Sequence, residues 1–304
     1  MDSKIKKNIT NQNNYLCKFG HLKNMTNYTT HKNFFNENYD IGDTELYTNF
    51  ADVFVLKVQT LDIARELKLH KINPVIVNLV NEHFTGGNID SLEGVYDDDL
   101  NLRTNFSIIA KMNNNYPPKK NEVLYTQNVI ALRDEKINPY NNVNMCFSVS
   151  VITVSTHKKY ILDKTDESKL ELNEYISLKQ KIEAVLQTAH MGNNDAIIFR
   201  DFGCLEDGLP INDIIEIYNS CILKYGQFFK NIIFCIPIKT SKDIPVFNYF
   251  LKEIIKPQDL INENEINNID INNYLNQDNQ LQDSDSDENN NNQILFNILA
   301  KATS

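Results

Sequence analysis

Residues 78–104, NLVNEHFTGGNIDSLEGVYDDDLNLRT, decide the fold and raise the question of function. They follow the apolar, β-branched run at 74–77, which is typical of a buried strand. Gly86 and Gly87 come next, in a chain that has only nine glycines, and residues 97–99 then open a helical pattern with three aspartates. The stretch therefore predicts a strand, a glycine loop and an acidic helix start in close succession.

The glycines and aspartates have a functional interpretation and a purely structural one. Gly86 and Gly87 reach positive φ without penalty and let backbone approach a ligand, while Asn78 and Asn81 at the strand exit offer amide groups to a sugar. The alternative is a loop turned by Gly-Gly, followed by acidic residues at 97–99 that favour a helix start. Spacing alone favours this alternative.

Short apolar runs alternate with helical patterns along the rest of the chain. The predicted strands are 53–58, 75–78, 129–132, 147–153, 196–199 and 232–236. The predicted helices are 62–67, 170–190 and 212–229. This alternation predicts an α/β domain with a mostly parallel or mixed sheet and helices on both faces. In such sheets the ligand site lies beyond the carboxyl ends of the central strands.

A second strand end also carries glycines. Residues 196–213 read AIIFRDFGCLEDGLPIND, and Gly203 and Gly208 lead into a helix that opens near Asn212. Free N–H groups and the helix dipole at such a place suit a phosphate group. An ordinary strand-to-helix turn is the stronger alternative, since the acids at 206–207 would repel a phosphate.

Composition excludes several classes of function. The chain has 304 residues, 41% of them hydrophobic, so it can bury a real core. A net charge of −10 argues against duplex nucleic acid or an anionic membrane as a direct partner. The sequence has no membrane-spanning stretch and no secretory signal, which predicts a cytoplasmic or nuclear protein.

The cysteines and histidines predict neither disulfides nor a metal site. Five cysteines are odd in number and widely spread, which indicates reduced thiols. The six histidines do not stand at metal-ligand spacing with cysteine, so we expect no zinc site. Cys204 follows a glycine at a strand end, but with no histidine nearby we interpret it as a small buried thiol rather than a nucleophile.

In their order, these segments resemble the microbial-type poly(ADP-ribose) glycohydrolases, a branch of the macrodomain fold. The family motifs Asn-Phe-Ala-Asn, Pro-Gly-Gly-Gly and Gln-Glu-Glu have counterparts here at 78–81, 85–88 and 96–98. Further counterparts lie at 125–129, 132–134, 151–153, 181–182 and 203–205, and Leu100 and Arg103 also match. Each motif is degenerate, but together they cover roughly residues 45 to 240 in collinear order.

The resemblance implies a catalytic role for the acidic pair. In the family, the second acidic residue protonates the departing ribose oxygen and then activates water for attack on an oxocarbenium-like centre. By position that residue is Asp98, with Asp97 orienting the ligand. If the register slips by one residue, Asp99 becomes the candidate instead.

The resemblance also implies a ligand site formed by two glycine loops. The first loop would press backbone against ADP-ribose, and the second would cradle its diphosphate. The implied ligand-binding residues are Asn78, Asn81, Gly86, Gly87, Asn88, Tyr96, Gly203, Cys204, Leu205 and Gly208. The expected partner is ADP-ribose or an ADP-ribosylated protein, with no cofactor and no metal, and no signal indicates an oligomeric state.

The departures from the family pattern leave three functions open. Asp98 is one methylene shorter than the family glutamate, Tyr96 replaces glutamine, and Asn88 and Leu205 replace glycines. A misplacement of about 1 Å can cost on the order of 100-fold in rate. An active glycohydrolase, a non-catalytic module that binds ADP-ribose, and an interaction protein that keeps only the fold all remain as hypotheses.

The resemblance divides the chain into three parts. Residues 1–45 are expected to be an accessory segment that is partly helical or disordered, and residues 46–255 to be the macrodomain-like catalytic domain. Residues 256–304 are rich in Asn and Asp and have too few apolar residues to fold on their own, which predicts a disordered tail. Its last apolar stretch, at 293–302, is expected to form a short helix.

Overall fold

The protein is built around one mixed sheet. The computed structural model describes residues 3–18, 29–39, 50–81, 98–133, 147–156, 160–204, 208–238 and 240–257. Within them lies a seven-stranded sheet in the order β1-β4-β5-β3-β6-β7-β2. The strands are β1 (Thr29–Asn33), β2 (Asp52–Leu56), β3 (Pro74–Asn81), β4 (Val123–Ile130), β5 (Ser148–Thr156), β6 (Ala196–Phe199) and β7 (Asn231–Cys235). Strands β2, β7, β6, β3 and β5 run parallel, and β4 is antiparallel to both β5 and β1.

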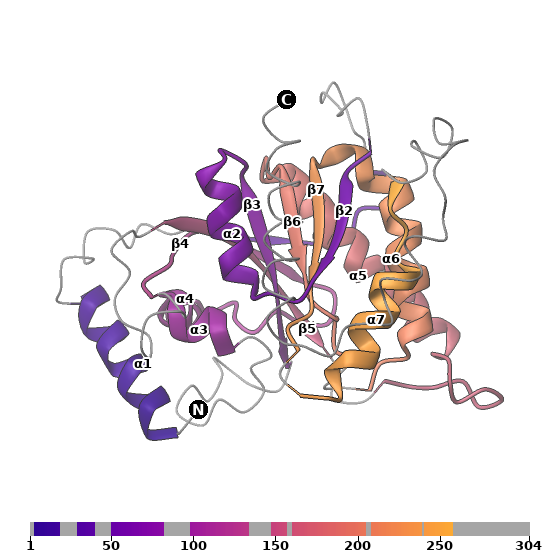
Figure 1. Cartoon of the computed structure of the whole chain (residues 1–304), viewed down its shortest axis with the longest axis horizontal. Coiled ribbons are helices and arrows are strands. Elements are labelled where there is room, and N and C mark those ends of the chain that lie inside the picture. The colour runs from indigo at the N-terminus through magenta and orange to yellow at the C-terminus, as the bar shows by residue number, and fades with distance from the viewer. Residues whose placement is uncertain are drawn as a thin grey trace, which may run out of the picture.

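Helices cover both faces of this sheet (Figure 1). One buried cluster joins the sheet to α5 (Leu172–Met191), α6 (Ile211–Tyr225) and α7 (Asp243–Glu253). A second cluster joins the other face to α2 (Thr60–Leu69), α3 (Asp98–Arg103) and α4 (Phe106–Met112). The outermost helix, α1 (Ser3–Lys18), contacts α4 and the end of β4 through a third cluster. The predicted α/β class with helices on both faces is thus confirmed.

The central strands are apolar along their whole length because both of their faces are covered. All four residues of β6 and all five of β7 are buried. A parallel sheet between two helical layers requires such continuous apolar runs. For this reason the ranges predicted from the sequence, 196–199 and 232–236, agree with the observed β6 and β7 to within one residue.

Other elements differ from the prediction for physical reasons. The predicted strand 129–132 is only the end of β4, because a bulge between Thr126 and Val129, with Asn128 at φ 58°, breaks its alternating pattern. The polar edge strand β1 and the helices α4 and α7 were not predicted. The helical lead-in expected within residues 1–45 is confirmed as α1, whereas the predicted tail lies outside the described residues beyond position 257. The domain boundaries stay predictions.

Candidate functional site

The predicted site lies where the carboxyl ends of the parallel strands form a step. Ile76 of β3 pairs with Ile198 of β6, and β6 ends one residue later at Phe199. Strand β3 continues to Asn81, which pairs with Thr156 of β5. The chain after β6 therefore leaves the sheet beside the protruding end of β3, which is the arrangement that places ligands in open α/β sheets.

The chain leaving β6 makes a tight turn at the residues predicted to cradle a diphosphate. The Cys204 amide donates to the Asp201 carbonyl at 3.2 Å. The two central residues, Phe202 and Gly203, have φ of 54° and 95°. Positive φ at both central positions is the signature of a type I′ turn, which glycine accepts and an aromatic residue rarely adopts.

Burial of the Phe202 ring holds this turn in place. Its side chain is buried and contacts the ring of Tyr218 on α6 edge-to-face, with centroids 6.3 Å apart. Burying a phenylalanine side chain contributes about 1.5–3 kcal/mol. A non-glycine residue in such a backbone region costs about 1–3 kcal/mol, so ring burial offsets the strain. The turn is consequently built into the core of the domain.

Burial and a neighbouring carboxylate decide the protonation state of the Cys204 thiol in this turn. Burial, and secondly the nearby Asp201 carboxylate, raises the pKa of Cys204 well above its ordinary value. Burial likewise raises the pKa of the Tyr218 hydroxyl, which has no hydrogen-bond partner among the described residues. A neutral thiol is a poor nucleophile, so the interpretation of Cys204 as an unreactive thiol stays the favoured one, although the residue is half-buried rather than buried.

Asn78 faces the layer that contains α3. Its neighbours in β3 alternate: Val77 packs in the cluster with α5, α6 and α7, and Ile76 in the cluster with α2, α3 and α4. Asn78 shares the face of Ile76 because strand side chains alternate. The side chain of Asn78 is 1% exposed, as part of the sheet interior rather than at the strand tip.

The amide of Asn78 is not satisfied by the described protein. Neither its nitrogen nor its oxygen has a partner of normal hydrogen-bond geometry among these residues, and the same holds for the buried hydroxyl of Thr153, its register partner on β5. Burial raises the pKa of Tyr116, and the adjacent Asn78 amide opposes this rise, so the two side chains lie near each other without a well-formed bond. Leaving a buried amide without a partner costs about 1–3 kcal/mol, which makes this position a candidate ligand contact.

The acidic candidate Asp98 is the first residue of α3. Leu100, two residues further along the helix, lies in the same buried cluster as Ile76. Beyond α3, Thr104 donates to the Leu100 carbonyl at 2.6 Å, and the Ile130 amide donates to Asn105 Oδ1 at 2.8 Å. These contacts fix the corner after α3 against the end of β4.

The structure thus brings part of the predicted site to one edge of the sheet. Asn81 and the Gly203-Cys204 turn lie at the ends of neighbouring strands, and Asn78 lies in β3 three residues before its end. Gly208 follows at φ 66°. Within the described part of the chain, no group of three His, Cys, Asp or Glu side chains is placed to hold a metal ion. Six predicted residues lie outside the described residues: Gly86, Gly87, Asn88, Tyr96, Asp97 and Leu205.

Sequence reasoning missed three residues of this region, two of them buried (Phe202 and Thr153) and one half-buried (Tyr116). Phe202 determines the turn, and Thr153 and Tyr116 adjoin the Asn78 amide. An aromatic residue directly before a glycine, between a strand and a helix, was an available signal for the turn. No local pattern links Tyr116 to Asn78. None of the described helices is both long and apolar enough to cross a membrane.

Comparisons with known proteins bear on the fold. No family model matches the sequence, and no curated protein matches it. The poly(ADP-ribose) glycohydrolase of Thermomonospora curvata is 12% identical, with a TM-score of 0.63 over 81% of this chain and 98% of that one. The same enzyme bound to the inhibitor ADP-HPD is 13% identical, with a TM-score of 0.60 over 81% and 98%.

A second bacterial enzyme gives the same result. The poly(ADP-ribose) glycohydrolase of Deinococcus radiodurans in complex with ADP-ribose is 15% identical, with a TM-score of 0.51 over 68% of this chain and 86% of that one. At these identities the likeness establishes the fold and not the activity. The chain therefore has a macrodomain-like fold of the kind found in bacterial poly(ADP-ribose) glycohydrolases, as the motif resemblance predicted.

Proposed function

We propose that this protein binds ADP-ribose at the carboxyl edge of β3, β5 and β6 and hydrolyses ADP-ribose glycosidic linkages on modified proteins. The observation that carries the proposal is the type I′ turn at Phe202 and Gly203. A strained backbone that is maintained by core packing indicates a functional constraint. This one stands between β6 and α6, where the resemblance expects the diphosphate.

The unsatisfied amide of Asn78 supports the same site. A buried amide with no partner among the described residues gains its hydrogen bonds when a ligand supplies hydroxyl or carbonyl groups. The ribose units of ADP-ribose carry such hydroxyls. Asn78 and the turn belong to neighbouring strands, so one ligand spanning the step between β3 and β6 would meet both.

Asp98 is the proposed acid and base. A single carboxyl group that first donates a proton to the leaving oxygen and then removes one from water requires reach within hydrogen-bond distance of both. Aspartate withdraws the carboxyl by roughly a bond length relative to glutamate, and about 1 Å of misplacement costs on the order of 100-fold. The favoured second function is accordingly a non-catalytic ADP-ribose-binding domain.

The test measures release of ADP-ribose from an auto-modified protein by the wild type and by three variants. Asp98→Ala is expected to abolish release, and Asp99→Ala is the matched control on the same helix. Asp98→Glu restores the missing methylene and is expected to raise the rate by up to about 100-fold. Loss of release in Asp99→Ala alone would move the role to that residue. No release by the wild type or by Asp98→Glu would leave the non-catalytic function.

A further inference from the structure

We propose that α1 holds α3 in position for the active site. The contacts that do so are made by Asn13, Arg133 and Arg103. Helix α3 begins at Asp98, so the orientation of the helix sets where the backbone of that residue lies. The catalytic meaning of this inference rests on the proposed role of Asp98. Its structural content, that α1 holds α3 in place, stands on the contacts below.

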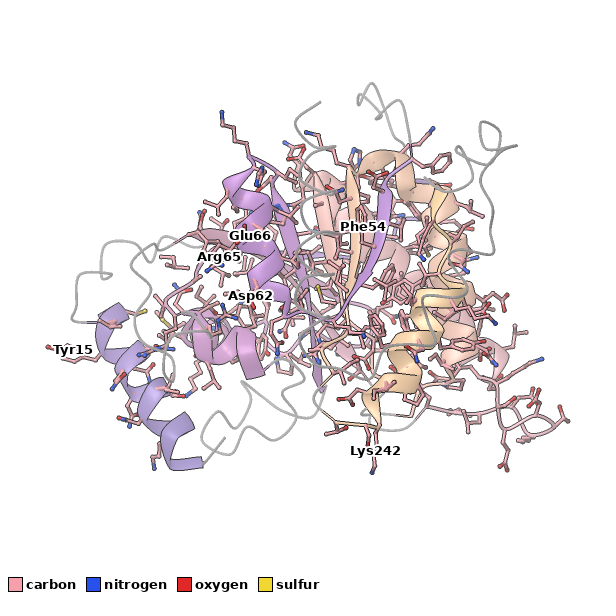
Figure 2. All side chains as sticks on the ribbon, viewed as in Figure 1. Tyr15, Phe54, Asp62, Arg65, Glu66 and Lys242 are labelled. Carbon is pink, nitrogen blue, oxygen red and sulfur yellow. The ribbon has the colours of Figure 1, made fainter. Side chains whose placement is uncertain are left out.

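Helix α1 docks through one narrow stripe with a polar residue in its middle. The buried residues of its described part are Ile9, Thr10, Asn13 and Cys17, spaced by three, four and seven positions as on one helix face. Tyr15 is 64% exposed and points away from the domain (Figure 2). A buried asparagine in such a contact stripe fixes the register of a helix at some cost in stability.

Asn13 uses both ends of its amide to join α1 to two other segments. Its nitrogen donates to the carbonyl of Leu102 in α3 at 2.9 Å, and its oxygen accepts from Nε of Arg133 at 2.8 Å. Gln12 accepts a second bond from Arg133, at Nη2, at 3.0 Å. A sliding or rotation of α1 would break these contacts together, so the helix has one docked position.

Arg103, the last residue of α3, continues the chain of contacts into the domain. Its Nε donates to the Arg133 carbonyl at 3.1 Å, and its Nη2 contacts Asp62 of α2 at 2.7 Å. The amide of Leu132 donates back to the Arg103 carbonyl at 2.6 Å. The Arg103 side chain is 3% exposed against 22% for Asp62, whose label in Figure 2 stands at the end of α2 nearest α3. Truncating a buried, charge-assisted contact of this kind is costly.

Because α3 is short, a small tilt about its last residue, Arg103, displaces its first residue, Asp98. The helix has six residues, so Asp98 and Arg103 are about 7.5 Å apart along the axis at the standard helical rise. A tilt of roughly 8° about Arg103 moves Asp98 by about 1 Å. Such a displacement is enough to cost on the order of 100-fold in a reaction that needs a placed carboxyl group.

The experiment removes one contact of Asn13 and keeps the other. Asn13→Asp retains the oxygen that accepts from Arg133 but replaces the donor to the Leu102 carbonyl with a repelling carboxylate. Gln187→Glu is the matched control: Gln187 is also a buried amide, donating to the Asn36 carbonyl and Tyr225 hydroxyl at 3.0 and 3.1 Å. It lies in the last turns of α5, a helix that packs on the opposite face of the sheet from α3.

Three quantities are measured in each full-length variant: amide hydrogen exchange across residues 98–106, the dissociation constant for ADP-ribose, and the rate of ADP-ribose release. In Asn13→Asp we expect faster exchange and a kcat lowered about 10-fold or more, with a dissociation constant within about three-fold of wild type. Gln187→Glu should show neither change in α3 nor in kcat, even at an equal loss of thermal stability.

Exchange and kcat that match between Asn13→Asp and Gln187→Glu would overturn the inference. If Asn13→Asp does not fold, Gln12→Ala, at an exposed position that removes only the contact with Arg133 Nη2, is measured in its place with the same expectation. A wild type that neither binds nor releases ADP-ribose would refute the proposed function. In that case hydrogen exchange alone decides whether α1 holds α3.

Discussion

Replacing Gly203 with alanine tests whether the turn after β6 has the mirrored geometry on which the site depends. At φ 95° an L-residue lies beyond the left-handed helical region, so the strain is about 2 kcal/mol. Alanine also restricts the unfolded chain, which returns about 0.4–1 kcal/mol. The expected net loss of unfolding free energy is therefore about 1–2 kcal/mol.

Gly208→Ala is the matched control in the same connection. Its φ is 66°, and no atom of the described residues lies within 4 Å of where the alanine Cβ would stand, so the strain is about 1 kcal/mol and the net loss is close to zero. Urea denaturation of the two variants, followed by circular dichroism, measures the difference. Equal losses for the two variants, or a larger loss for Gly208→Ala, would refute the assigned turn.

Phe202→Asn tests whether burial of the Phe202 ring holds the same turn. Asparagine tolerates the left-handed region, so turn preference alone favours the replacement. The substitution also removes a ring that is buried against Tyr218, and truncating a buried phenylalanine costs about 3–5 kcal/mol. The expected net destabilisation is about 2 kcal/mol or more in the same urea assay. A stabilised variant would show that the ring does not hold the turn.

Three further substitutions test other parts of the account. Gly192→Ala places a Cβ 2.4 Å from the hydroxyl of Tyr125, and by breaking its hydrogen bonds should cost about 3 kcal/mol in urea denaturation. Asn78→Leu removes a buried amide that has no partner in the described part of the chain. The variant should have a higher melting temperature and weaker ADP-ribose binding in calorimetry, and a lower melting temperature would show that the buried amide carries no such cost. Burial lowers the pKa of His190, whose Nδ1 contacts the Tyr39 hydroxyl, so the free energy of unfolding should fall as pH drops below about 6.5. In His190→Gln the free energy of unfolding should depend less on pH, as measured by urea titrations at neutral and acidic pH.

The lowered pKa of His190 determines the direction in which stability changes with pH. Protonation of His190 is harder in the folded than in the unfolded protein, so below the unfolded pKa the unfolded state binds more protons. Stability is unaffected above that value and is lost as pH falls toward the lowered folded pKa. A variant with the same slope as the wild type would show that other groups carry the acid sensitivity.

The sequence was enough to predict the strands that are buried on both faces of the sheet. The runs AIIF and NIIFC are buried on both faces, so their apolar content alone identifies β6 and β7. By contrast β1, with the sequence TTHKN, pairs on one side only and carries polar side chains that give no strand pattern. Helix α1 is mostly polar, and its buried stripe becomes meaningful only once Arg133 and Leu102 are brought to it.

The candidate site was predictable in its location more than in its chemistry. Glycines after strands marked the loop at Gly203, and register places it beside the end of β3. The Phe202 conformation depends on packing against α6, and the burial of the Asn78 amide without a partner among the described residues depends on how the neighbouring elements pack around it. Both are consequences of contacts between residues far apart in the chain, which periodicity and composition do not encode.

Calorimetric titration of the full chain with ADP-ribose tests the central claim most directly. The account predicts saturable binding with a dissociation constant on the order of micromolar, equivalent to about −8 kcal/mol. It also predicts that Asp98→Ala retains binding, since that residue acts on the bond to be cleaved. Absence of heat at protein concentrations that would detect a millimolar site would contradict the account, and would mean that this macrodomain-like fold does not use its strand-end site for ADP-ribose.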